Sequence, residues 1–268
     1  MARLMDTAFR MRTPLVVANW KMHGRQALLG AYAAGVTSGF MRISGVECAV
    51  CPPATYLAAF AACLREHGDD GLALGLGAQD CSPEGADGAY TGEVGAAMLA
   101  DVGCGWVIVG HSERRARQHE DDALVARKFE AALDAGLKPI LCVGETQAQR
   151  EAGKAEEVVR GQLLAVMGRT GPERMAQAAV AYEPIWAIGS GQPATPQSAQ
   201  EMHDMMRRCI AGRSEAAAAS VRLLYGGSVK PDNARDFFAQ PDIDGALIGG
   251  ASLDPASFCA IAAAAAVA

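Results

Sequence analysis

Residues suited to acid–base and anion chemistry stand at or just after the ends of three short apolar runs: Asn19, Lys21, His111 and Glu183. Glu183 precedes Pro184, and the proline ring disfavours a helical conformation at the glutamate and holds it extended. A carboxylate in such a place can take a proton from carbon if burial and closure of the site raise its basicity. The alternative is that Glu183 is a salt-bridged structural glutamate.

His111 precedes Ser112-Glu113-Arg114, which predicts the start of a helix. The positive end of the helix dipole favours a neutral imidazole. A neutral imidazole can donate a hydrogen bond to a carbonyl and pass protons between adjacent oxygens. The alternative is a hydrogen-bonded structural histidine. We expect His67, His119 and His203 to be solvated helix or loop residues, because they do not follow an apolar run in this way.

Two glycine-rich turns, Gly226-Gly227-Ser228 and Gly249-Gly250, follow the last two apolar runs. Glycine lets the backbone approach a ligand, and successive N–H groups form a nest for an anion. Either turn alone could be an ordinary connection, but together they predict a phosphate site. Asn19 and Lys21 are two residues apart and can point the same way, so that Lys21 can place its charge near a phosphate or a developing enediolate.

Other function classes find no support in the sequence. It has no histidine, cysteine and carboxylate spacing typical of a metal site, and no nucleotide-binding loop of the GxGxxG or GxxxxGK[ST] type. The formal net charge of −6 argues against a nucleic-acid or membrane partner. A base, an electrophile, a cation and an anion cradle without a cofactor predict the aldose–ketose isomerisation of a small phosphorylated sugar.

Eight apolar runs alternate with polar turns and segments of helical spacing: 15–19, 46–51, 72–79, 106–110, 138–143, 178–183, 221–225 and 245–248. The runs are continuous, as is typical of parallel strands covered on both faces. Residues 121–135 are an amphipathic helix candidate that ends before Gly136, and Pro231 is expected to open a short helix at 231–233.

No linker or change of composition divides the chain, which predicts a single-domain (β/α)8 barrel of eight parallel strands. We expect residues 1–12 to be a poorly ordered N-terminal extension and residues 13–268 to be the catalytic barrel. The chemistry of such barrels is carried at the carboxyl ends of the strands. The eight cysteines are scattered and form no CxxC pair, which favours reduced thiols and a cytoplasmic protein.

Five segments resemble the triosephosphate isomerase family, and they occur in the family's order: VANWKMHG at 17–24, VGHSERR at 109–115, AYEPIWAIGSG at 181–191, YGGSVKPD at 225–232 and IDGALIGGASL at 243–253. The resemblance covers nearly the whole chain. It implies the interconversion of dihydroxyacetone phosphate and D-glyceraldehyde 3-phosphate through an enediol(ate), in glycolysis and gluconeogenesis and without a cofactor.

The resemblance also implies a role for each matching residue. Glu183 would be the base and His111 the neutral electrophile, while Lys21 and Asn19 would hold the substrate. Glu113 would support the site through a charge network. Backbone N–H groups of four residues would bind the phosphate: Gly189, Ser228, Gly249 and Gly250.

Residues 79–94 resemble the long third loop with which members of this family contact a partner subunit. Thr91 at its tip would reach towards the partner's Asn19 and Glu113, which implies a homodimer. The resemblance also implies an active-site lid at residues 184–195. The chain departs from the family at Gln192-Pro193, where a lysine-led hinge is usual, so the resemblance does not determine how this lid moves.

Two rival functions remain from the sequence. A sister enzyme acting on a four-carbon sugar phosphate would need more room beyond the reacting carbons. A non-catalytic relative would be expected to have lost at least one of the four candidate catalytic residues, and none is lost. Other phosphate-binding barrels lack the lid sequence WAIGSG.

Overall fold

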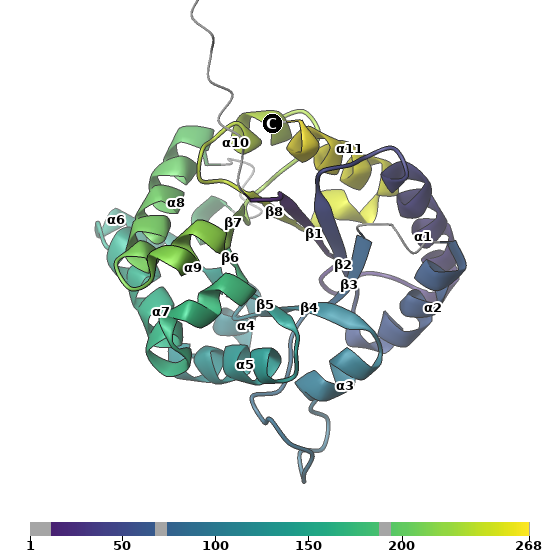
Figure 1. The fold of residues 1–268 in the computed structure, drawn as a ribbon, viewed down its shortest axis with the longest axis horizontal. Helices are drawn as coiled ribbons and strands as arrows, with labels where there is room; N and C mark the ends of the chain where they lie inside the picture. The colour runs from purple at the N-terminus through teal and green to yellow at the C-terminus, as the bar shows by residue number, and fades with distance from the viewer. Residues whose placement is uncertain (1–11, 68–73, 188–193, 268) are drawn as a thin grey trace, which may run out of the picture.

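The computed structural model describes residues 12–67, 74–187 and 194–267. Parallel strands close into a barrel in chain order, as Figure 1 shows in a view along the barrel. Their bounds are β1 Leu15–Asn19, β2 Glu47–Cys51, β3 Leu74–Ala78, β4 Cys104–Val109, β5 Lys138–Val143, β6 Ala179–Tyr182, β7 Arg222–Tyr225 and β8 Gly245–Ile248. The ring closes where β1 pairs with β8, with Leu15 opposite Gly245. The predicted (β/α)8 barrel is confirmed.

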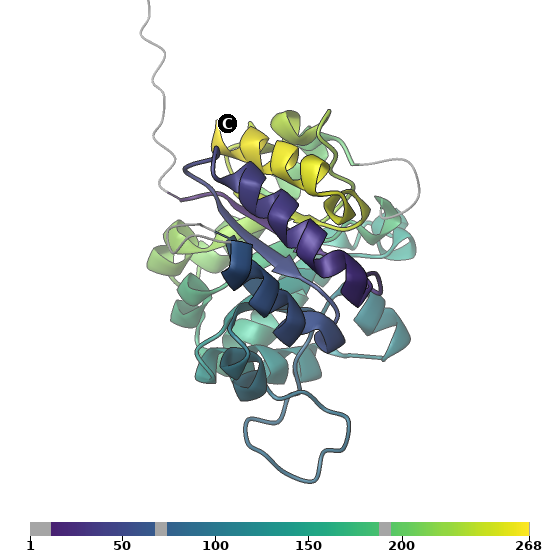
Figure 2. The same ribbon diagram turned by 90° about the vertical axis from the view of Figure 1, so that its right-hand side faces the viewer.

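Helices form a ring outside the strands (Figures 1 and 2). The α-helices are α1 Gln26–Phe40, α2 Leu57–His67, α3 Ala96–Asp101, α4 Ser112–Arg117, α5 Asp122–Asp134, α6 Gln147–Glu151, α7 Ala155–Thr170, α8 Pro196–Ala211, α9 Glu215–Ser220, α10 Ala234–Phe238 and α11 Pro255–Ala266. Short 3-10 helices are η1 Ala54–Tyr56, η2 Pro172–Gln177, η3 Ile185–Ala187 and η4 Gly250–Leu253.

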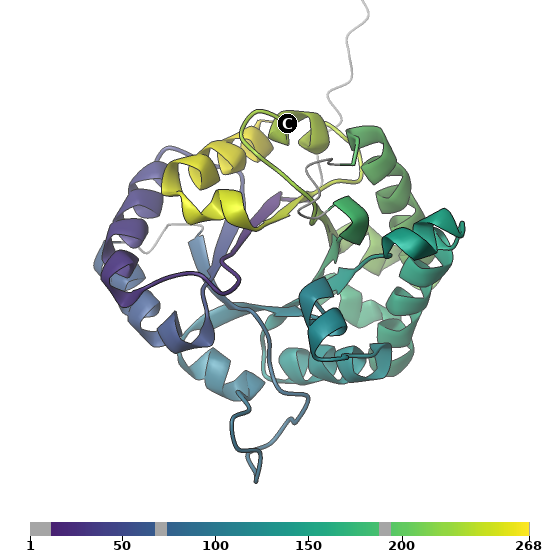
Figure 3. The ribbon, with the colours of Figure 1, turned by 180° about the vertical axis from the view of Figure 1, so that it is seen from behind.

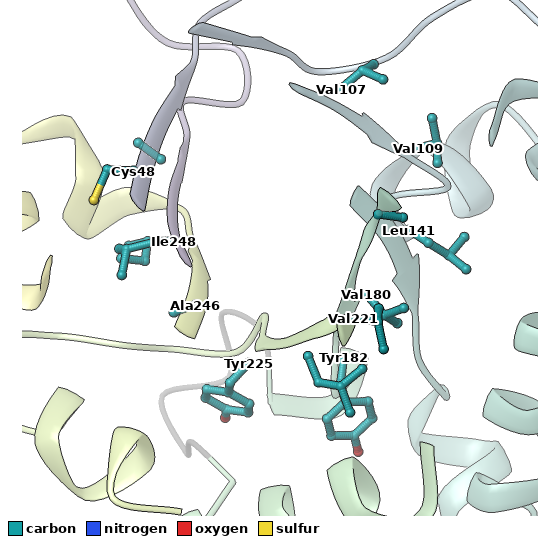
Figure 4. Packing of buried hydrophobic residues seen from close by; sticks show 14 of the residues in the cluster. Cys48, Val107, Val109, Leu141, Val180, Tyr182, Val221, Tyr225, Ala246 and Ile248 are labelled. Atoms are coloured by element: carbon teal, nitrogen blue, oxygen red, sulfur yellow. The ribbon is translucent and has the colours of Figure 1, made fainter. Parts of the chain in front are cut away.

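Alternate residues of the strands other than β3 enter two separate apolar clusters, because successive side chains of a strand point to opposite faces. One cluster fills the space between strands and helices, where Figure 4 shows Val107, Val109 and Leu141. The other cluster fills the barrel itself and includes Val17 and Ile108. Burial on both faces explains why the strands appear in the sequence as continuous apolar runs.

The helix predicted at 121–135 is confirmed as α5, whose N-cap Asp121 accepts a hydrogen bond from the Leu124 N–H. Gly136 follows with a φ of 78°, a left-handed conformation that favours glycine. The prediction that a helix opens at 231–233 is wrong. α10 begins only at Ala234, because the Asn233 side chain closes a turn by accepting from the Lys230 N–H at 2.8 Å.

The prediction of a solvated His203 is also wrong. Its side chain is fully buried on α8, with Nδ1 2.7 Å from the Ala199 carbonyl oxygen one turn earlier. The ring also packs edge-on against the Tyr182 ring of β6. Burial lowers the pKa of His203, which keeps the imidazole neutral. The helix turn and the neighbouring strand therefore make it a core residue.

Asp244, just before β8, joins the N-terminal segment to the barrel. Its fully buried carboxylate accepts from Arg12 Nε at 2.8 Å, from Arg207 Nη2 at 2.7 Å and from the Leu223 N–H at 2.9 Å. Arg12, at the end of the predicted extension, is thus attached to the barrel by this ion pair. Residues 1–11 lie outside the described part.

We expect Asp244→Ala to lower the free energy of unfolding by about 1–3 kcal/mol, because the change removes a fully buried carboxylate that accepts from Arg12, from Arg207 and from the Leu223 N–H, while Arg207 keeps its ion pair with Asp242. Urea unfolding followed by circular dichroism measures this loss. The matched control is Asp232→Ala at an exposed position, which should stay within about 0.5 kcal/mol of wild type. Equal stability of the two variants would show that the buried network contributes nothing.

Candidate active site

A cavity of about 350 Å³ opens at the carboxyl ends of the strands. It brings together residues that are far apart in the sequence: Asn19, Lys21, His111, Glu183, Ser228, Gly249 and Gly250. Each lies at or just beyond the end of a strand, where the sequence analysis placed it. Gly189 lies outside the described residues. Glu113 lines an adjoining cavity of about 300 Å³ that shares Lys21.

The backbone at Lys21 is held in an unusual conformation. Its φ of 52° is left-handed, a region that a lysine rarely adopts. The Asn19 side-chain oxygen accepts from the Lys21 N–H at 3.0 Å, and Gln79 Nε2 donates to the Lys21 carbonyl at 2.9 Å. These two contacts from β1 and the end of β3 stabilise the strained backbone and aim the side chain into the cavity.

Gln79 is a site residue that the sequence analysis did not select. Its amide also donates to the Cys51 carbonyl at 2.8 Å, so that it links the ends of β1, β2 and β3. The signal that could have found it is its position directly after a strand, the same signal that selected Asn19.

The Lys21 ammonium forms a salt bridge with Glu113 at 2.7 Å. Both side chains are partly exposed, with 27% and 47% of their surface accessible. Glu113 lies in the first turn of α4, where a carboxylate is favoured by the helix dipole. The predicted proximity of Glu113 to the site is therefore observed as direct contact with Lys21.

His111 and Glu183 are buried and contact each other. His111 Nε2 lies 2.9 Å from Glu183 Oε1, and the other carboxylate oxygen accepts from the Ser112 N–H at 2.7 Å. His111 is the N-cap of α4, and its Nδ1 accepts from the Glu113 N–H at 3.2 Å. Because Nδ1 is an acceptor, the ring proton lies on Nε2 and points to the carboxylate.

Burial and the contact between the two side chains shift the pKa values of His111 and Glu183 in opposite directions. Burial alone would lower the pKa of His111, but the neighbouring Glu183 carboxylate outweighs it and raises that pKa above its ordinary value. Burial alone would raise the pKa of Glu183, but His111 and the Ser112 N–H stabilise the anion and lower that pKa. In this arrangement Glu183 is an ionised carboxylate whose basicity is restrained by two hydrogen bonds.

The two glycine-rich turns leave backbone donors at the cavity wall. The N–H groups of Ser228 and Gly250 donate to no acceptor in the part of the chain that the structure describes. Asn233 fixes the first turn from behind, because its amide nitrogen donates to the Ser228 carbonyl at 3.3 Å. Ordered N–H groups without a protein acceptor are suited to an anion.

Glu145, at the end of β5, anchors the segment that follows Glu183. Its buried carboxylate accepts from Trp186 Nε1 at 2.8 Å and from the Tyr182 hydroxyl at 3.0 Å. The Arg150 guanidinium covers the Trp186 ring at 4.4 Å. Trp186 is therefore held firmly near the start of residues 184–195, the segment predicted to form the lid. Residues 188–193, which contain Ser190 and Gln192-Pro193, lie outside the described residues.

Within residues 12–67, 74–187 and 194–267, no three metal-ligating side chains lie together in a place that could hold a metal ion. The reactive groups that line the cavity are a carboxylate, an imidazole, an ammonium and backbone N–H donors. Such a set can move a proton between carbon and oxygen atoms of a bound anion.

Comparison with known proteins agrees with this geometry. A family model described as triosephosphate isomerase matches residues 14–265. A triosephosphate isomerase from Chloroflexus aurantiacus is 51% identical over 252 residues, covering 94% of this chain and 98% of the relative. One from Alcanivorax borkumensis is 52% identical over 250 residues, covering 93% and 97%. With a closed eight-stranded barrel and His111 paired to Glu183 at its mouth, the chain belongs to the triosephosphate isomerase family.

Proposed function

We propose that this chain interconverts dihydroxyacetone phosphate and D-glyceraldehyde 3-phosphate without a cofactor, as a step of glycolysis and gluconeogenesis. The observation that carries the proposal is the buried contact of 2.9 Å between His111 and Glu183, with Lys21 lining the same cavity. These are a base, a hydrogen-bond donor and a cation, which isomerisation of a hydroxy ketone requires.

Glu183 takes the proton from C1 of dihydroxyacetone phosphate. The C–H electron pair forms the C1–C2 double bond, and the carbonyl oxygen on C2 becomes the oxyanion of an enediolate. To reach the carbon, the carboxylate has to leave His111 and the Ser112 N–H, which now lower its pKa. The loss of these two hydrogen bonds in a buried site increases its basicity.

His111 Nε2–H and the Lys21 ammonium stabilise the developing oxyanion. The imidazole then passes protons between the oxygens on C1 and C2, and Glu183 returns its proton to C2 to give the aldehyde. Asn19 keeps Lys21 in place through its 3.0 Å hydrogen bond and lines the cavity itself. The N–H groups of Ser228, Gly249 and Gly250 bind the phosphate, with Gly189 as a fourth donor.

A coupled assay with D-glyceraldehyde 3-phosphate and a four-carbon sugar phosphate tests the function. We expect turnover of the triose phosphate and a much lower kcat/KM for the longer substrate. A preference for the four-carbon substrate would assign the chain to the sister reaction, and no turnover of either would assign it to the non-catalytic relatives.

We further propose that the protein is a homodimer in which residues 79–94 contact the partner subunit. This segment projects from the barrel as an open loop in Figures 2 and 3. It carries the exposed Tyr90 and Thr91, while Met22 beside the site has 94% of its surface accessible. The cavity of about 300 Å³ between Met22 and Arg114 offers a place for the partner's loop tip next to Lys21 and Glu113.

Replacing residues 86–91 with a short turn should produce monomers with little activity, because Lys21 and Glu113 would lose the support of the partner's loop. Analytical ultracentrifugation together with the coupled assay measures both effects. Circular dichroism serves as the control that the barrel stays folded. A fully active monomer of the wild type at nanomolar concentration would contradict the dimer proposal.

A cytoplasmic location is supported by the cysteines. All eight are free thiols, and six of them are buried. In the described parts of the chain, no helix combines the length and the apolar character needed to span a bilayer. We propose that residue 13 onwards forms one catalytic domain, to which Arg12 is attached through Asp244.

A further inference from the structure

Lys230 lines the active-site cavity beside Ser228 and Gly249. Among the described residues that line this cavity, the lysines are Lys21 and Lys230. The proposed mechanism gives Lys230 no part, and its side chain is exposed at the wall formed by the glycine-rich turn.

The three charged groups closest to the catalytic contact, Lys21, Glu113 and Glu183, do not together favour an anion. The Lys21 ammonium lies 2.7 Å from the Glu113 carboxylate, and Glu183 adds a second negative charge. Apart from His111, these groups carry one positive charge against two negative ones. A phosphate monoester itself carries a charge of about −1.5 to −2 near pH 7. A further cation at the wall of the cavity would therefore strengthen the attraction of the substrate.

The Lys230 ammonium group makes no hydrogen bond or ion pair with any residue in the described segments. Asp232, the nearest acid along the chain, is exposed and forms no ion pair with it. The charge of Lys230 is therefore not neutralised locally, in contrast to that of Lys21.

The backbone of Lys230 is firmly held. Its N–H donates to Asn233 Oδ1 at 2.8 Å, and its carbonyl accepts from the N–H groups of Asn233 and Ala234 at 3.2 and 3.0 Å. Val229 before it is buried, and Pro231 after it has a fixed φ. The side chain thus starts from a rigid point on the loop that also carries the Ser228 N–H, and only the side chain has to be ordered on binding.

We propose that Lys230 is a specificity-determining residue that attracts and holds the doubly charged phosphate group of the substrate. This proposal rests on the proposed function of the site. Lys230 acts through charge from the solvent side, so its effect is on substrate capture and not on the chemical step. Salt weakens such an effect, because the Debye length falls to about 10 Å at 0.1 M ionic strength.

The test compares wild type with Lys230→Gln, Lys230→Arg and the control Lys154→Gln, whose lysine is exposed but lines no part of this cavity. KM and kcat for D-glyceraldehyde 3-phosphate and the inhibition constant of inorganic phosphate are measured at about 20 mM and about 300 mM ionic strength. For Lys230→Gln we expect both KM and the inhibition constant to rise roughly three- to tenfold at low salt, with kcat within twofold. At high salt the difference should shrink to less than about twofold.

Lys230→Arg should restore the wild-type values, because it restores the charge. If Lys230→Gln behaves like Lys154→Gln at both salt concentrations while the wild type is active and is inhibited by phosphate, this proposal fails and the proposed function stands. If Lys230→Gln lowers kcat with unchanged KM, Lys230 has a structural role instead. A wild type that neither turns over the substrate nor binds phosphate would overturn both proposals.

Discussion

Glu183→Gln is expected to reduce kcat by about three orders of magnitude. The amide has the shape of the carboxylate, and its oxygen can still accept from the Ser112 N–H, as Glu183 does at 2.7 Å. It cannot take a proton from carbon, and general-base catalysis contributes typically 10²–10⁴-fold. The coupled assay, run in both directions of the isomerisation, measures the loss.

The change should leave the stability of the protein nearly unaltered, which separates a catalytic role from a structural one. Urea unfolding should give a free energy within about 2 kcal/mol of wild type, because the side chain keeps its volume and its hydrogen bond from the Ser112 N–H and loses only the one from His111. Glu157→Gln on the exposed face of α7 is the matched control and should retain full activity. Activity of Glu183→Gln within tenfold of wild type would remove Glu183 from the role of base.

Lys21→Ala is expected to lower kcat/KM by about three orders of magnitude. The change removes the cation. It also leaves the Glu113 carboxylate, which lies 2.7 Å from the Lys21 ammonium in the wild type, without this partner at the mouth of the site. Two unit charges about 4 Å apart interact by about 4 kcal/mol at an effective dielectric constant of 20, which corresponds to roughly a thousandfold. We expect both a raised KM and a lowered kcat, because the charge acts on the substrate and on the oxyanion.

The double variant Lys21→Ala/Glu113→Gln separates the two causes. Removing the unpaired carboxylate should recover part of the lost phosphate affinity, measured as the inhibition constant of inorganic phosphate, but not the lost kcat. Additive losses in the double variant would show that Glu113 and Lys21 act independently. If Lys21→Ala keeps both kinetic constants near wild type, the phosphate site lies elsewhere.

The fold followed from the sequence because its determinants are local. Each strand is buried on both faces and therefore appears as an unbroken apolar run, and the observed strand ends differ from the predicted ones by no more than two residues. The candidate site followed for the same reason. In a closed parallel barrel all carboxyl ends of the strands meet at one rim, so residues just after the runs, such as Lys21 and Ser228, lie together.

Individual helix starts and histidine environments were less predictable. α10 begins at Ala234 and not at Pro231, because the Asn233 side chain stabilises a turn that competes with helix formation. His203 stands next to the polar Asp204 in the sequence, yet its ring is buried against the Tyr182 ring of β6. The spacing of apolar residues predicts neither the start of α10 nor the burial of His203, because each depends on one side-chain contact.

By itself the sequence determined the strands, the closed barrel and the residue types at its active rim. Only the tertiary structure decided which of these residues contact each other and with what charge. His111 and Glu183 are 72 positions apart, yet the register of β4, β5 and β6 brings Nε2 and Oε1 within 2.9 Å. That contact reverses the expected direction of the Glu183 pKa, because hydrogen bonds to the anion outweigh burial. Electrostatic energies depend on such distances, and no local pattern in a chain encodes them.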